Sequence, residues 1–147
     1  MTCAAVDVQL LGPVLVTRAG EPVTNFRSHK TLALLAYLVA TRRPVARNYL
    51  AELLWPETSA TDGRGHLRRA IHDLTQKLPN ALIADYYTVA IDPACFGQSD
   101  LARFEALRRL ETESELREAA GLCRGPFLEG IDLDDCPAFE AWLTAER

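Results

Sequence analysis

The feature that most constrains the fold is an uncharged run of 11 residues, 31–41. Leu32, Leu35, Ala36 and Val39 recur at the spacing of one helix face, and further leucines widen that face. The run is far shorter than the ~20 residues that span a bilayer. A helix that is apolar almost all round must be covered by other elements, so we expect residues from 29 onward to form a core helix, capped by Ser28.

The elements predicted around this helix define a fold class. Before it, strands are expected at 6–10, 14–18 and 23–26, as a small antiparallel meander. After it, apolar periodicity predicts helices at 47–55 and 60–78, each followed by proline, and the alternation at 81–92 predicts a β-hairpin. Ser59 is placed to cap the helix at 60–78, and two glycines near its start predict a frayed first turn. Three helices followed by a hairpin form the layout of a winged helix-turn-helix.

The composition changes after Pro93. Residues 1–96 carry 10 basic and 8 acidic side chains, whereas residues 97–147 carry 6 basic and 12 acidic ones. Helical periodicity is expected at 100–112, 113–123 and 137–147, with no strand signal, and the last helix reaches the chain end without a capping glycine. We therefore predict an α+β winged-helix domain over 1–95 and the N-terminal part of an all-α domain over 98–147, cut inside a longer helical domain.

Motifs for catalysis or metal binding do not occur in the sequence. It lacks a phosphate-binding loop and a zinc-protease motif, and Gly63 and Gly65 do not form a dinucleotide fingerprint. His66 and His72 are six residues apart, and no Cys/His pair has zinc-ligand spacing. We expect no enzyme activity, no cofactor, no metal and no membrane partner. With no signal peptide, the protein is expected in the cytoplasm, its four scattered cysteines being interpreted as reduced thiols.

The helix at 60–78 carries the candidate binding face. With its leucines turned inward, Arg64, Arg68 and His72 point outward, and arginine can read guanine edges in the major groove. We assign these three to base contacts, while a solvated charged face remains the alternative. Asp73 on the same helix would repel phosphates. Phosphate contacts are assigned to Arg42, Arg43, Arg47, Arg69 and Lys77, partly because a helix N-terminus near 47 offers backbone N–H groups.

Three stretches resemble one bacterial family. "LLGPVLVTRAGEPV", "HKTLALLAYLVATRRPVARNYLAELLWPE" and "GHLRRAIHDLTQKLP" are similar to the N-terminal part of SARP-like, AfsR-type transcriptional activators, with an OmpR/PhoB-type winged helix. "DLARFEALRRLE" and "LREAAGLCRGPFLEGIDLDDCPAFEAWLTAER" resemble the start of the TPR-like bacterial transcriptional activator domain.

The resemblance implies a mode of action. It implies a sequence-specific DNA-binding transcriptional activator whose third helix enters the major groove of double-stranded DNA and whose hairpin touches the minor groove. Tyr86 and Tyr87 in the wing could bond phosphates or pack within the hairpin. The resemblance further implies contact between RNA polymerase and the loop at Glu57, Thr58 and Ser59, and homodimers on direct repeats. The alternative is a winged-helix protein-interaction module of a larger signalling protein that no longer binds DNA strongly.

Overall fold

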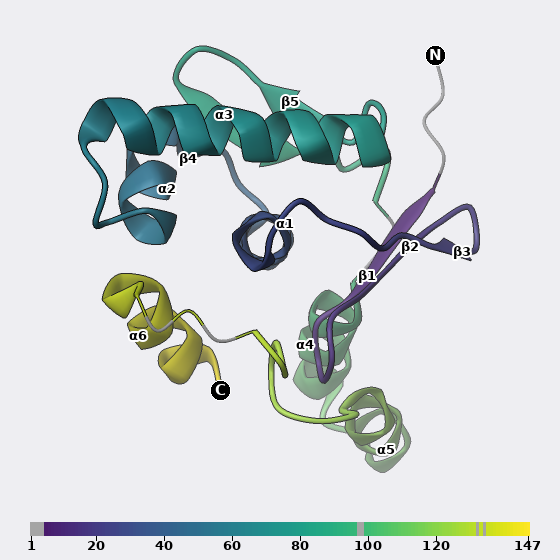
Figure 1. Ribbon diagram of the computed structural model, residues 1–147. Coiled ribbons are helices and arrows are strands. Elements are labelled where there is room, and N and C mark those ends of the chain that lie inside the picture. The colour runs from purple at the N-terminus through teal and green to yellow at the C-terminus, as the bar shows by residue number, and fades with distance from the viewer. Residues whose placement is uncertain (1–4, 97–98, 132, 134) are drawn as a thin grey trace.

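Helix α1 (His29–Thr41) lies at the centre of the molecule. The computed structural model describes residues 5–96, 99–131, 133 and 135–147. In Figure 1, α1 is seen end-on, with α3 (Ala60–Lys77) on one side of it and the C-terminal helices on the other. The N-cap prediction is confirmed, because the Ser28 hydroxyl accepts a hydrogen bond from the backbone N–H of Thr31 at 3.2 Å. Eight of the 13 residues of α1 are buried, as an all-round apolar helix requires.

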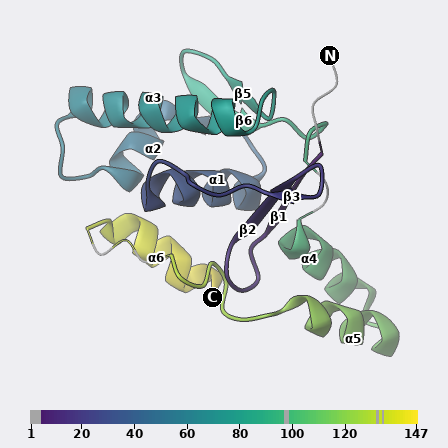
Figure 2. The ribbon, with the colours of Figure 1, turned by 45° about the vertical axis from the view of Figure 1, so that its right-hand side comes forward.

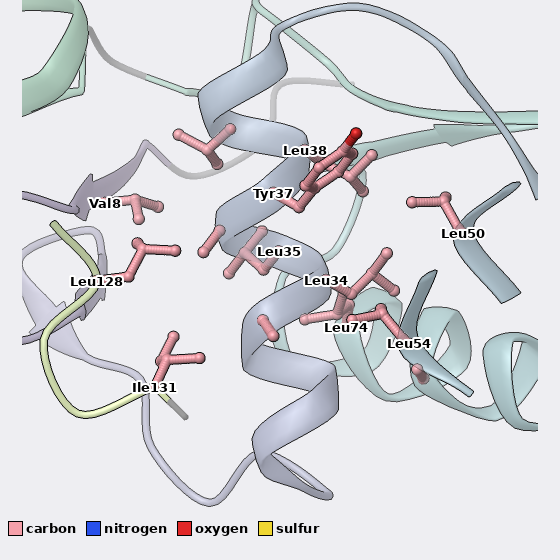
Figure 3. Close-up of a cluster of buried hydrophobic side chains, with 14 of the residues drawn as sticks. Val8, Leu34, Leu35, Tyr37, Leu38, Leu50, Leu54, Leu74, Leu128 and Ile131 are labelled. Atoms are coloured by element: carbon pink, nitrogen blue, oxygen red, sulfur yellow. The ribbon is translucent and has the colours of Figure 1, made fainter. Parts of the chain in front are cut away.

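Two sets of side chains cover α1 from opposite directions. Figure 3 shows Leu50, Leu54 and Leu74 from the helix-turn-helix on one side of α1, and Val8, Leu128 and Ile131 on the other. All these residues belong to one continuous buried cluster. The core therefore includes residues from both halves of the chain, with α1 as the common layer between them.

A three-stranded antiparallel sheet precedes α1. It has the order β1–β2–β3, formed by β1 (Val6–Gln9), β2 (Leu15–Arg18) and β3 (Glu21–Pro22). The alternation of buried and exposed residues along β1 confirms the first predicted strand. The prediction of a third strand at 23–26 is wrong, because the chain turns at Ala19–Gly20 and pairs at once, Arg18 opposite Glu21. Beyond that pair, Asn25 adopts φ 62°, which is not strand backbone.

The helix-turn-helix and its wing follow α1. Helix α2 (Arg47–Leu54) leads to α3, and the hairpin pairs β5 (Leu82–Ala84) with β6 (Thr88–Ile91). The Ser59 hydroxyl accepts from the N–H of Asp62 at 3.1 Å, as expected. One strand was not predicted, β4 (Val45–Ala46), which pairs with β6 and makes the wing a three-stranded sheet of order β4–β6–β5. Two residues between a proline and a helix carry no periodicity that could indicate a strand.

Three helices complete the described chain, α4 (Asp100–Leu110), α5 (Glu113–Leu122) and α6 (Pro137–Glu146). Figures 1 and 2 both place them across α1 from α3. The Asp100 carboxylate joins this part to β1, because it accepts the backbone N–H groups of Leu10 at 2.7 Å and Leu11 at 2.9 Å. No helix among the described residues is both long and apolar enough to span a bilayer.

The cysteines differ from expectation in one case. Cys123 and Cys136 are free thiols, as predicted, and burial raises the pKa of Cys136 to about 11. Cys95 is disulfide-bonded, so the expectation of a reduced thiol is wrong there. Cys3 lies outside the described residues.

Candidate nucleic-acid interface

An exposed row of basic side chains runs along α3. Leu67, Ile71 and Leu74 are buried, whereas Arg64, Arg68 and His72 are exposed. The row spans about 12 Å along the axis, from a rise of ~1.5 Å per residue. Within the part of the chain that the structure describes, neither arginine is in an ion pair with a carboxylate. Both guanidinium groups are therefore available to an external anion or base edge.

The start of α3 lies close against α2. Gly63 is buried, and a Cβ placed there would lie 3.2 Å from the Thr58 hydroxyl oxygen and 3.6 Å from the Ala51 Cβ. The first turn is helical and capped by Ser59, while the expected fraying of that turn stays a prediction. The glycine permits the close approach of the two helices, and this contact orients the exposed row of α3.

A stacked pair supports the flank of the row. The Trp55 indole, at the end of α2, and the His66 imidazole are 5.8 Å apart between centroids, with an angle of 15° between planes. The same imidazole also contacts Arg69, whose Nη1 lies 3.2 Å from the His66 Nδ1. Sequence reasoning assigned Arg69 but not its support, because Trp55 and His66 belong to different helices and their stacking follows from the helix-turn-helix geometry.

Asp73 faces away from the exposed row. Its carboxylate accepts hydrogen bonds from the Lys77 ammonium at 2.5 Å and from the backbone N–H of Arg27 at 2.8 Å. Burial acts to raise the pKa of Asp73, but the hydrogen bonds from Lys77 and Arg27 outweigh it and lower the pKa. The expected repulsion of phosphates is therefore largely removed. The same contact engages Lys77, whose ammonium also lies 6.0 Å from the Phe26 ring centroid.

The wing tip presents two aromatic side chains to solvent. Tyr86 and Tyr87 are 84% and 74% exposed, and their rings meet edge-on with centroids 5.0 Å apart. This exposure rules out packing inside the hairpin. The Asp85 carboxylate holds the turn by accepting the N–H groups of Tyr87 and Thr88, and these hydrogen bonds lower the pKa of Asp85.

Arg47 ties the wing to α2. Its Nε donates to the Asp85 carbonyl at 2.7 Å, and its backbone N–H donates to the Tyr87 carbonyl at 2.8 Å. The helix that begins at Arg47 has no side-chain cap, because Ala46 occupies the N-cap position. The guanidinium predicted for phosphate binding thus already has a structural partner in the wing tip.

The remaining predicted residues lie in the turns on either side of α2. Arg42 ends α1 in a left-handed conformation and pairs with Glu105 of α4 at 3.3 Å. Arg43 is exposed and has no ion-pair partner among the described residues. Glu57, Thr58 and Ser59 lie on the exposed loop between α2 and α3. The Thr58 hydroxyl donates to the Trp55 carbonyl at 2.9 Å, and the Ser59 hydroxyl accepts from the backbone N–H of Asp62 in the first turn of α3.

Taken together, helix α3, its partner α2 and the three-stranded wing define a winged helix-turn-helix of the type found in SARP regulators. Figure 2 shows α3 and the hairpin side by side along one edge of the molecule. Recognition by helix and wing is a known use of this fold, in which the exposed helix faces the major groove.

Relatives of known identity carry the same arrangement. The chain is 32% identical over 157 aligned residues to transcriptional regulatory protein EmbR of Mycobacterium bovis and of Mycobacterium tuberculosis, a match that covers 95% of this chain. A solved structure of M. tuberculosis EmbR in complex with a low-affinity phosphopeptide matches 97% of the chain with a TM-score of 0.71 and 28% identity. No family model matches the sequence.

These matches confirm the resemblance to SARP-type regulators, since the chain is homologous to EmbR over nearly its whole length. The chain spans about 40% of the length of the curated relatives and 41% of the solved chain.

Proposed function

We propose that the protein is a sequence-specific DNA-binding transcriptional regulator, an activator that places α3 in the major groove and performs no catalysis. The observation that carries the proposal is the exposed row of Arg64, Arg68 and His72, held outward by buried leucines on the same helix. Homology to EmbR, a transcriptional regulatory protein, supports the same function.

Base reading is assigned to the row on α3. A guanidinium can donate two hydrogen bonds to the O6 and N7 acceptors of guanine, and a major groove ~12 Å wide admits one helix. The row is about as long as three to four base-pair steps, from ~1.5 Å of rise per helical residue. Arg64, Arg68 and His72 are therefore the proposed base contacts.

Among the proposed phosphate contacts, exposed side chains without an ion-pair partner are expected to contribute most. Arg43 and Arg69 are exposed, and Tyr86 and Tyr87 offer hydroxyl donors from the wing tip. Arg42, Arg47 and Lys77 stay in the proposed set. Each already has a partner, so each would contribute less than a free side chain.

Further parts of the proposal concern partners and organisation. We propose residues 1–95 as the DNA-binding domain and 98–147 as the start of a TPR-like activator domain. The exposed loop at Glu57, Thr58 and Ser59 is the proposed contact for RNA polymerase, and two copies are proposed to bind direct repeats in the cytoplasm. The polymerase contact and the dimer on direct repeats extend the family resemblance to this chain, whereas the domain bounds rest also on composition and periodicity and the cytoplasmic location on the lack of a signal-peptide pattern.

Removal of one base-reading arginine tests the proposal. Fragments selected from a random DNA pool supply the target, and binding of Arg68→Ala to that target is measured by fluorescence anisotropy. We expect a loss of about 1–3 kcal/mol and relaxed selectivity at one base position. The matched control is Arg109→Ala, which removes an exposed arginine from α4. Unchanged affinity of Arg68→Ala would contradict the groove assignment.

Salt dependence distinguishes phosphate contacts from base contacts. Arg43→Ala should weaken binding to all sequences alike and reduce the slope of log K against log salt by about 1. The measurement is a salt titration with target and unrelated duplexes. If the parent chain shows no binding that steepens as salt falls, the protein-interaction module becomes the better account.

A further inference from the structure

We propose that a cleft between the wing and α4, here named the wing cleft, binds a small amphipathic organic anion. The wing cleft has a volume of about 390 Å³ and is formed where the end of α1, the β5–β6 hairpin and the start of α4 meet. None of its apolar wall residues is among the base or phosphate contacts assigned above. Its two arginines, Arg42 and Arg43, are also proposed phosphate contacts, so the wing cleft shares these two side chains with the DNA-binding proposal.

The wall of the wing cleft is mainly apolar. It is formed by Val39, Ile83, Ala90, Ile91, Phe96 and Ala102. Ile83 and Ala90 are cross-strand partners and so lie on the same face of the hairpin. Ile83 is 56% exposed. Covering this side chain with an apolar group removes apolar surface from water, which is favourable. This face of the wing therefore favours the apolar body of a ligand.

The rim of the wing cleft carries two guanidinium groups. Arg42 is held by Glu105 of α4 at 3.3 Å, so its charge is already balanced. Arg43 has no ion pair with a carboxylate in the part of the chain that the structure describes. An arginine beside an apolar wall favours a carboxylate, because the planar guanidinium donates two parallel hydrogen bonds to it. Charge complementarity thus selects an anion over a neutral or cationic ligand.

The size of the wing cleft favours a small molecule over a segment of protein. Small-molecule sites occupy ~300–1,000 Å³ and are mostly apolar with a few polar groups. The wing cleft matches both criteria, because Arg42, Arg43 and Ser99 are the residues with polar side chains among those that line it, and the Ser99 hydroxyl already caps α4 by accepting from the Ala102 N–H. An amphipathic helix would need a longer groove to seat residues over two turns. A medium-chain carboxylate has the size and polarity that fit.

A bound anion would compete with DNA for one side chain. Arg43 is both the free charge at the wing cleft and a proposed phosphate contact, so occupancy of the cleft should weaken DNA binding and DNA should weaken anion binding by the same factor. This regulatory consequence rests on the proposed function, whereas anion binding itself does not.

The test measures binding of sodium decanoate to the whole chain by isothermal titration calorimetry, with 1-decanol as the uncharged probe. We expect one saturable site for decanoate and weaker binding of 1-decanol. Arg43→Gln should weaken decanoate binding by about tenfold or more. Ala90→Phe, which fills the wing cleft, should abolish it. Arg109→Gln removes an equal charge elsewhere on the surface and should leave decanoate binding unchanged.

Two results would overturn the proposal. One is the absence of saturable decanoate binding; the other is equal binding of both probes that neither Arg43→Gln nor Ala90→Phe changes. Thermal melts of each variant show whether it is folded, and Arg43→Gln keeps the test decisive if Ala90→Phe is not. Because calorimetry needs no DNA, failure of the anion site and failure of the DNA-binding proposal are distinguished.

Discussion

Helices α3 and α5 use their charged side chains in opposite ways. On α3, five residues are buried and the arginines of the exposed row have no acidic partner among the described residues. On α5 only Ala119 is buried, and two of its three acidic side chains form ion pairs with arginines, Glu113 with Arg117 of the same helix and Glu118 with Arg103 of α4. The two helices therefore differ in the availability of their charges: the arginines of the exposed row on α3 are unpaired among the described residues, whereas acidic side chains of α5 are in ion pairs.

The largest expected effect concerns packing beneath the two helices. Leu74→Ala should destabilise the protein by about 2–5 kcal/mol, because a fully buried leucine leaves a cavity under α3. Leu116→Ala on α5 should change the stability by less than about 0.5 kcal/mol, since that side chain is 44% exposed. Urea unfolding measures both. Similar losses would show that α5 is packed as firmly as α3.

The next effect concerns the hydrogen bonds that join the start of α4 to the end of β1. Asp100→Ala removes the acceptor of the Leu10 and Leu11 N–H groups and should cost about 1–3 kcal/mol, the penalty for unsatisfied buried donors. Asp100→Asn keeps one acceptor oxygen and should cost less. Hydrogen exchange at both amides locates the effect. Unchanged protection in Asp100→Ala would mean that water replaces the carboxylate.

A smaller effect is expected in acid, at the inner side of α3. The pKa of Asp73 is lowered from 3.8 in the folded state, so its ion pair stabilises the fold above that pH and the contribution is lost as pH falls through the folded pKa. Asp73→Asn should therefore lose less stability than the parent on acidification below pH 3.8. Denaturant unfolding over a pH series measures this. Lys77→Met should remove part of the same dependence, leaving the share due to the Arg27 N–H.

The smallest effect is expected on the outer face of α5. Glu113→Gln breaks an ion pair in which both side chains are about four-fifths exposed (80% and 78%). Such pairs contribute about 0.3–0.5 kcal/mol, and salt screens them. Unfolding at low and high salt should therefore show a difference that disappears at high salt. A larger loss would mean that the charges of α5 have a structural role.

The local features of the fold could be predicted from the sequence. Ser28 and Ser59 cap helices whose apolar spacing is regular over several turns, and the exposed row of α3 follows from the same spacing. Predictions failed where a contact depends on distant residues. Val45 and Ala46 form a strand only because β6 lies beside them, and the partners of Asp100 are about 90 residues away.

The candidate site shows the same limit. Periodicity alone predicted that Arg64 and Arg68 face outward. Whether the other charged side chains are paired or free depends on side-chain contacts. Asp73 and Lys77 lie four residues apart on one helix, a spacing from which their pairing could have been predicted. The contacts of Arg47 with the wing and of Arg42 with α4 carry no such signal, since their partners lie 38 and 63 residues away.

The two hydrogen bonds from Arg47 to the wing tip have a mechanical consequence. They connect the hairpin to the start of α2, and α2 in turn packs closely against α3 at Gly63, so these contacts set the spacing between α3 and the wing-tip tyrosines. On the proposed mode of binding, a duplex has to match the spacing between α3 and the wing tip or deform to fit it. The energy of such deformation depends on base sequence, so selectivity would extend to base pairs that no side chain touches.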